Sequence, residues 1–242
     1  MKQMKLMVMV VTLALVVSVG GAMAASYYDD FSGGLTPSGW NGGAGWSLIT
    51  GTPNVYQCNT NGDTTSWNNW VIPSAWTYSA DMALVAGYSS GGRGINADLR
   101  MNGTQGNFIA DVLYMVDSEQ YLINFQYYNG SSWTTVLSSG WSNSGAFTDS
   151  DVQVSATRNP GANTLIFQIA SNGTTIYTGT TSAFSAGFLD GISMAGLRVY
   201  DGEANFKNVT LTDLTPVPEP SSILFMVPGV AGLLGLALRK RS

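Results

Sequence analysis

Away from its two ends, the chain alternates apolar and polar side chains with a period of two. Tyr121, Ile123 and Phe125 occupy every second position of one run, and Val209 and Leu211 alternate with polar neighbours in another. A period of two places alternate side chains on one face of a β-strand. No stretch keeps the helical period over three turns, so we predict an all-β body.

The turns and strands of this body can be placed from residue type. Asn129-Gly130 and Asn172-Gly173 tolerate the positive φ angles of two-residue hairpin turns, and residues 159–163 predict a longer turn. About a dozen strands, with a turn roughly every 8 to 12 residues, indicate a single antiparallel β-sandwich. We predict strands at residues 78–86, 95–101, 108–116, 121–128, 133–137, 152–157, 164–170, 174–178, 195–200 and 204–212.

The N-terminus has the pattern of a secretory signal peptide. Lys2 and Lys5 precede an apolar run over residues 6–19, and Ala22 and Ala24 provide the small residues of a cleavage site. We therefore predict a signal peptide that ends at residue 24 and is removed by signal peptidase. The alternatives are a buried N-terminal helix and a retained membrane anchor.

The C-terminus consists of a short motif, a hydrophobic segment and a basic tail. A helix over residues 223–238 would span about 24 Å, which is less than the ~30 Å hydrocarbon core of a bilayer. We predict a short transmembrane helix over about residues 221–238, with its basic end on the cytoplasmic side. The motif is Val217, Pro218, Glu219 and Pro220, and the tail contains Arg239, Lys240 and Arg241.

These three parts, in this order, resemble the PEP-CTERM sorting domain of Gram-negative bacteria over residues 216–242. The resemblance implies recognition of Pro218-Glu219-Pro220 by an exosortase. It also implies a precursor held transiently in the inner membrane and then moved to the cell surface or the exopolysaccharide matrix. A plain tail anchor that contains Pro-Glu-Pro by chance is the alternative.

The charge of the body, residues 25–215, excludes one class of partner. It contains 14 acidic and five basic residues, a formal charge of −9, so it will not bind nucleic acid by phosphate neutralisation. An anionic polysaccharide would need a bridging cation. The only cysteine, Cys58, excludes an intrachain disulfide. We predict a buried, inert thiol there, with an intermolecular disulfide as the alternative.

The two ends of the body resemble the first and last strands of concanavalin A-like (laminin-G-like) jelly rolls. The similarity lies in residues 28–32 and in residues 196–209. It implies a single jelly-roll β-sandwich in which these ends lie together. An unrelated β-sandwich is the alternative.

Catalytic residues of the common types are not visible. Without histidine, Ser-His-Asp chemistry and His-based zinc sites are excluded. A glycosidase needs two carboxylates about 5 to 10 Å apart, whereas Asp111 and Asp117 on one strand would be about 20 Å apart. Glu119 and Glu203 are isolated along the chain. We therefore expect no enzymatic activity, with an atypical glycoside hydrolase as the alternative.

Ligand binding is better supported. Trp67, Asn68, Asn69 and Trp133 combine indoles with amides at strand edges, and such groups contact sugar rings and hydroxyls. Core packing of the tryptophans is the competing interpretation. We predict a non-catalytic carbohydrate-binding or structural protein of the surface or matrix. A purely structural protein without a ligand site remains open.

A structural calcium ion is a further possibility. Asp29, Asp30, Asp201 and Glu203 come from the two ends that the jelly-roll resemblance brings together. Hard oxygen ligands of this kind suit Ca²⁺. Solvated acidic residues in turns are the alternative.

Overall fold

The computed structural model describes residues 26–34, 39–87, 94–103, 106–115, 120–128, 131–143, 150–185 and 187–216. Ser26–Thr215 form a compact unit. Several predictions fall outside the described residues: the signal peptide with Ala22 and Ala24, the motif at 217–220, the hydrophobic segment at 221–238 and the tail at 239–242. None of the helices that the structure describes is long and apolar enough to cross a membrane.

The regular structure in the described part of the chain is almost entirely β-strand, as predicted. It contains one short 3-10 helix, η2 (Leu189–Gly191), and thirteen strands. The strands are β1 (Tyr27–Asp29), β2 (Asn41–Gly42), β3 (Trp46–Ile49), β4 (Val55–Trp67), β5 (Trp76–Gly87), β6 (Gly94–Gly103), β7 (Gly106–Met115), β8 (Gln120–Tyr128), β9 (Trp133–Asn143), β10 (Val152–Arg158), β11 (Ile166–Ser171), β12 (Thr174–Thr180) and β13 (Ile192–Asp213).

Each predicted strand overlaps a strand of the structure, but β1 to β4 were not predicted, and several elements differ in length from the prediction. β9 continues to Asn143, beyond the predicted end at residue 137. The predicted strands at 195–200 and 204–212 form one strand, β13, which bends at Asp201. The φ angle of Asp201 is 54°, and the register with β4 shifts between Tyr200 and Gly202. A bulge of this kind bends a strand and lets it continue in another direction.

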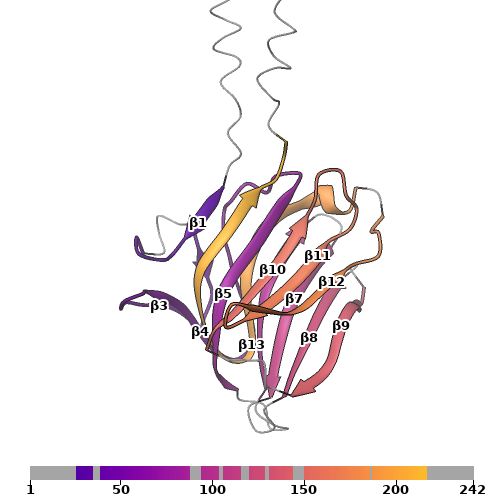
Figure 1. Cartoon of the computed structure of the whole chain (residues 1–242). Helices are drawn as coiled ribbons and strands as arrows, with labels where there is room; N and C mark the ends of the chain where they lie inside the picture. Colours follow the sequence, from indigo (N-terminus) through magenta and orange to yellow (C-terminus); the bar gives the residue numbers. More distant parts are fainter. Residues whose placement is uncertain are drawn as a thin grey trace, which may run out of the picture. The chain divides into compact units, whose positions relative to one another are not determined.

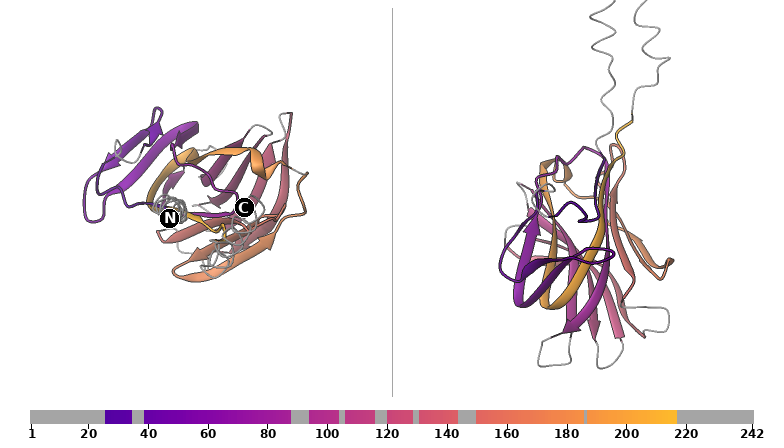
Figure 2. Two further views of the ribbon diagram at one scale, coloured as in Figure 1. Left: turned by 90° about the horizontal axis from the view of Figure 1, so that it is seen from above. Right: turned by 90° about the vertical axis from the view of Figure 1, so that its left-hand side faces the viewer.

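The bend in β13 divides the antiparallel ladder into two layers (Figures 1 and 2). The residues after the bend, 202–213, pair with β5, followed by β10, β11 and β12; we call this layer, with β1, the terminal sheet. Residues 192–200 pair with β6, followed by β7, β8 and β9; we call this layer the middle sheet. β4 follows the same bend and pairs with both halves of β13.

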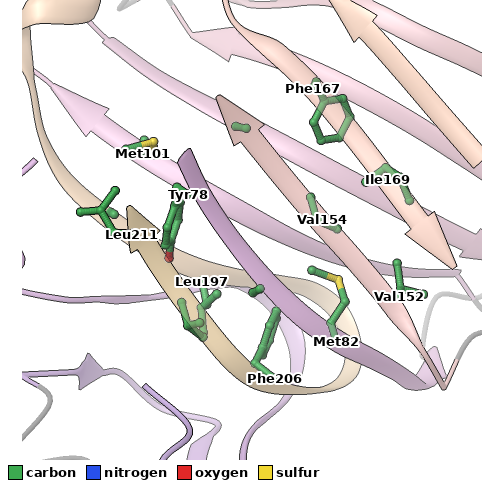
Figure 3. Packing of buried hydrophobic residues seen from close by; sticks show 14 of the residues in the cluster. Tyr78, Met82, Met101, Val152, Val154, Phe167, Ile169, Leu197, Phe206 and Leu211 are labelled. Carbon is green, nitrogen blue, oxygen red and sulfur yellow. The ribbon is translucent and has the colours of Figure 1, made fainter. Parts of the chain in front are cut away.

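The core lies between the two sheets, and side chains cross it to contact the opposite layer. The hydroxyl of Tyr78 on β5 donates to the carbonyl of Gly196 on β13 at 3.0 Å. The rings of Phe125 and Phe167 lie 5.7 Å apart, centre to centre. Figure 3 shows apolar side chains of both sheets packing together between the strands. The antiparallel sandwich predicted from the sequence is therefore confirmed.

The predicted features inside the sandwich can also be compared with the structure. The Asn172-Gly173 turn joins β11 to β12 with φ angles of 48° and 71°, as the hairpin prediction requires. Asn129-Gly130 lies outside the described residues. Cys58 is free and fully buried. Burial raises the pKa of Cys58 to about 12, so the thiol stays protonated and unreactive near neutral pH, as predicted.

Candidate functional site

The outer face of the middle sheet, which we call the middle face, gathers aromatic, charged and amide side chains. Alternation places these residues outward because Ser66, Leu197 and Val199, which come between them, are buried. On β4 and β13 the outward residues form three cross-strand pairs. The pairs are Trp67 with Gly196, Thr65 with Arg198, and Asp63 with Tyr200.

Trp67 lies against a position that has room only for glycine. A Cβ atom at Gly196 would lie 2.7 Å from Cε3 of Trp67 and 2.5 Å from the carbonyl oxygen of Ser66. The indole therefore packs directly over the backbone of β13, and its position is set by the sheet. Trp67 as a whole is half-buried.

Arg198 organises the charged part of the middle face. Its side chain is largely buried, and its Nε donates to Oδ1 of Asp63 at 2.7 Å. The guanidinium carbon lies 5.5 Å from the ring centre of Tyr200, a cation–π distance. Tyr200 is nevertheless 46% exposed. Arg198 thus holds an acidic and an aromatic side chain in fixed, accessible positions.

Trp133 lies on the same face at the far edge of the middle sheet. It is opposite Tyr128 in the register of β8 and β9, and the two ring centres lie 5.2 Å apart. Tyr128 points outward because Ile123 and Phe125, at odd-numbered positions of β8, are buried. Five strand spacings separate β4 from β9, so Trp67 and Trp133 lie about 24 Å apart across the strands.

A row of polar residues crosses the middle sheet between these aromatic positions. The register places Arg198 opposite Asp98, Asp98 opposite Asp111, and Asp111 opposite Asn124. From the sequence, Asp111 could be compared only with Asp117, which lies outside the described residues. The pairing of Asp111 with Asp98 was not predicted, because strand register is not visible in spacing along the chain. The one available signal was that each of two consecutive predicted strands contains an Asp, Asp98 in the first and Asp111 in the second.

The prediction of sugar contact needs correction at Asn68. This residue is only 2% exposed. Its backbone N–H donates to the carbonyl of Ala195 at 3.0 Å, and its Oδ1 accepts from the backbone N–H of Trp70 at 3.2 Å. Asn68 therefore shapes the chain after β4 and cannot reach a ligand. Asn69 is exposed.

Most of the tryptophans are core residues, in line with the competing interpretation. Trp40, Trp70 and Trp76 are buried. Trp46 packs on Tyr56, with ring centres 4.7 Å apart. The exposed aromatic surface therefore comes from few residues, and Tyr200 is one that the sequence analysis did not select.

The four predicted calcium ligands do not come together. Asp29 is opposite Val209, whereas Glu203 lies on the far side of the β13 bulges, opposite Asn59. Asp29 accepts hydrogen bonds from the backbone N–H of Phe31 and from Trp40 Nε1, both at 2.7 Å. No group of three or more His, Cys, Asp or Glu side chains that could hold a metal occurs among the residues the structure describes.

Asp30 and Glu203 of that set have local partners. Hydrogen bonds from the side chain and backbone of Ser32 lower the pKa of Asp30. Both carboxylate oxygens of Glu203 accept hydrogen bonds, from Gln57 at 3.0 Å and from Asn59 at 2.8 Å. The ends of the body do meet, as the jelly-roll resemblance implied, but their carboxylates serve the turns and strands beside them.

Comparison with known proteins identifies the C-terminal segment. Residues 216–242 match the family described as the PEP-CTERM protein-sorting motif. The chain thus carries a PEP-CTERM sorting signal, which implies an exported protein held at the membrane before cleavage. No curated protein sequence matches this chain.

Solved structures identify the fold of the body. The chain is similar to carbohydrate-binding module CBM66 from Bacillus subtilis, with a TM-score of 0.50, 19% identity, and coverage of 73% of this chain and 96% of that one. It is similar to the winged bean acidic lectin complexed with methyl-α-D-galactose, with a TM-score of 0.53, 10% identity, and coverage of 78% and 98%. The body is therefore a concanavalin A-like jelly-roll sandwich.

Proposed function

We propose that this protein is an exosortase-processed component of the cell surface or exopolysaccharide matrix that binds carbohydrate without catalysis. The observation that carries the proposal is the middle face, where Trp67 packs on Gly196 and an accessible Trp133 lies about 24 Å away across the strands. Signal peptidase and exosortase are the processing partners in this proposal.

The chemistry of the middle face suits an extended glycan. Indole rings provide flat apolar surfaces for the C–H faces of sugars, and Trp and Tyr combine such a surface with a polar group. Between the tryptophans, Asn124 and Gln126 of β8 are partly exposed amides that can bond hydroxyl groups. A chain of several sugar units that crosses the strands would meet both kinds of group. The lectin and carbohydrate-binding neighbours support this proposal through their fold.

Glycan binding can be tested with the full-length chain purified in detergent. We expect it to bind at least one polysaccharide on an array that includes the native exopolysaccharide. Trp67→Ala and Trp133→Ala should each weaken binding about tenfold, since each removes one aromatic surface. Val71→Ala is a matched control, because Val71 is 71% exposed and lies outside the middle face. Absence of binding to every glycan would favour the purely structural alternative.

The sorting step can be tested in cells. Glu219→Ala should leave unprocessed protein in the inner membrane fraction, because the motif is the proposed recognition element of the exosortase. Thr215→Ala is the control, since it changes a residue just before the matched segment. Normal processing of the Glu219 variant would overturn the exosortase assignment.

A second candidate, glycoside hydrolysis, is favoured by the pairing of Asp98 with Asp111. The Cβ atoms of directly opposed residues on antiparallel strands lie about 4.5 to 5.5 Å apart, and a retaining glycosidase needs two carboxyl groups about 5 to 5.5 Å apart. Release of reducing sugar from matrix polysaccharide, abolished by Asp98→Asn and by Asp111→Asn, would establish it. No release together with retained binding would support the non-catalytic proposal.

A further inference from the structure

The opposite side of the sandwich contains a pocket that the proposed function does not use. It lies on the outer face of the terminal sheet, which we call the terminal face, and has a volume of about 310 Å³. Its residues come from β5, from the start of β10, and from the β11–β12 hairpin. They are Asp81, Asp151, Gln153, Gln168, Ala170, Gly173 and Thr175.

The carboxylate of Asp81 is held in place from both sides. Gln153 Nε2 donates to its Oδ1 at 2.9 Å, and Asn208 Nδ2 donates to its Oδ2 at 2.8 Å. An ionised carboxylate oxygen can accept more than one hydrogen bond. Asp81 therefore presents two oriented acceptors to a ligand without having to reorganise.

Hydrogen bonds also fix the side of the pocket that the β11–β12 hairpin forms. The backbone N–H of Asn172 donates to the carbonyl of Asp151 at 3.0 Å, which ties the β11–β12 turn to the start of β10. Gln168 Nε2 donates to the Thr175 hydroxyl at 2.9 Å, so the proton of that hydroxyl can be given to a ligand. A Cβ built at Gly173 meets no atom within 4 Å, so this rim is open.

Size and charge narrow the class of ligand. Ligand pockets begin at roughly 300 Å³, so this one suits a single small ring. Its lining has two carboxylates, two amides and one hydroxyl but no Lys or Arg. Lys207, which the register places opposite Asp81, is not part of the lining. Such a lining matches sugar hydroxyl groups and repels an acidic sugar.

We propose that this pocket binds one neutral pyranose unit, and that a single molecule therefore bridges two glycan chains, one on each outer face. Pocket binding stands on the geometry of the terminal face alone. Bridging also rests on the proposed function of the middle face. A protein with two such faces would cross-link the polysaccharide of a matrix.

Pocket binding can be measured by saturation-transfer NMR on the full-length chain, with methyl glycosides of neutral hexoses as probes. We expect ring-proton signals for at least one neutral glycoside and none for methyl glucuronide. The double variant Gln153→Ala/Gln168→Ala should lose the signal. Thr180→Ala, an exposed change on β12 outside the lining, should keep it. Signals that persist in the double variant, or absence of signal from every neutral hexose, would overturn the proposal. Displacement of the sugar by millimolar CaCl₂ would show a cation site instead.

Bridging can be separated from the proposed function of the middle face by testing turbidity with a soluble polysaccharide. Trp67→Ala should weaken polymer binding about tenfold, by loss of one aromatic surface, but keep the saturation-transfer signal of the pocket. The pocket double variant should keep polymer binding but lose turbidity. Turbidity that is unchanged in the pocket variant would refute bridging, and it would leave binding at the middle face intact.

Discussion

The two outer faces of the sandwich share a strand but differ in chemistry. β13 contributes Arg198 and Tyr200 to the middle face and Thr210 to the terminal face. On the terminal face short hydroxyl side chains bond across strands, as in Ser79 with Thr210 at 2.6 Å and Thr77 with Thr157 at 3.0 Å. On the middle face large side chains are supported by glycine and by an ion pair.

Side chains on the inner faces of the two sheets form the core, so side chains on the outer faces can serve other purposes. Cross-strand Ser and Thr pairs add to sheet stability and leave a surface of small polar groups. Aromatic residues held at accessible positions, such as Tyr200 and Trp133, forgo some burial. The middle face therefore keeps aromatic side chains accessible, as the proposed glycan binding requires. Variants on the two faces test this contrast, from the largest expected effect to the smallest.

The largest effect is expected for Gly196→Ala. The new Cβ would overlap the Ser66 carbonyl oxygen and the Trp67 ring, and overpacking of this kind costs about 1 to 3 kcal/mol. Urea unfolding should show this loss, and displacement of Trp67 should weaken glycan binding. Gly62→Ala is the control, because a Cβ there meets nothing within 4 Å. Equal unfolding midpoints would show that Trp67 is not fixed by the glycine.

An intermediate effect is expected for Arg198→Met, which keeps much of the packing but removes the charge. The side chain of Arg198 is largely buried and that of Asp63 is half-exposed, so we expect a loss of about 1 kcal/mol of unfolding free energy. Glycan binding should fall several-fold because Asp63 and Tyr200 lose their common support. Calorimetry of the variant checks both. Unchanged binding would mean that the ion pair is only structural.

A smaller effect is expected on the terminal face, for Thr210→Val. The change removes the hydrogen bond with Ser79, and a net cost of about 0.5 to 1.5 kcal/mol is typical for a neutral hydrogen bond. Partial exposure of both residues puts this variant at the low end of that range. Glycan binding to the middle face should be unchanged. A clear loss of glycan binding in this variant would show that the terminal face also affects binding at the middle face.

The smallest effect near neutral pH concerns Cys58, on the inner side of β4. Its pKa of about 12 exceeds the ordinary thiol value of about 8.5. The protonated thiol therefore contributes its full share of the unfolding free energy below the ordinary thiol pKa, and this contribution is lost as the pH rises toward 12. We expect no labelling by a thiol reagent at pH 8 in the native protein and full labelling in urea. Rapid native labelling would show that Cys58 is exposed, and absence of labelling in urea would show that it is in an intermolecular disulfide.

The candidate site was only partly visible in the sequence. Trp133 could be selected from the sequence because it lies at the edge of a turn that is rich in Ser and Asn. Asn68 was misjudged, because adjacency to Trp67 does not show that the chain leaves the strand there and turns its amide inward. Asp98 and Tyr200 entered the site through strand register, which depends on partners far away in the sequence.

By itself, the sequence determined the strands from β5 onward, the Asn172-Gly173 turn, the buried thiol and the sorting signal, because each depends on local periodicity, backbone preference or a contiguous motif. Only the tertiary structure decided that β13 is one bent strand. The same is true of which acidic residues lie opposite each other in the register and of how Trp67 packs on Gly196. Those outcomes depend on which strands pair and in what register, and that choice is made by burying side chains that are distant along the chain.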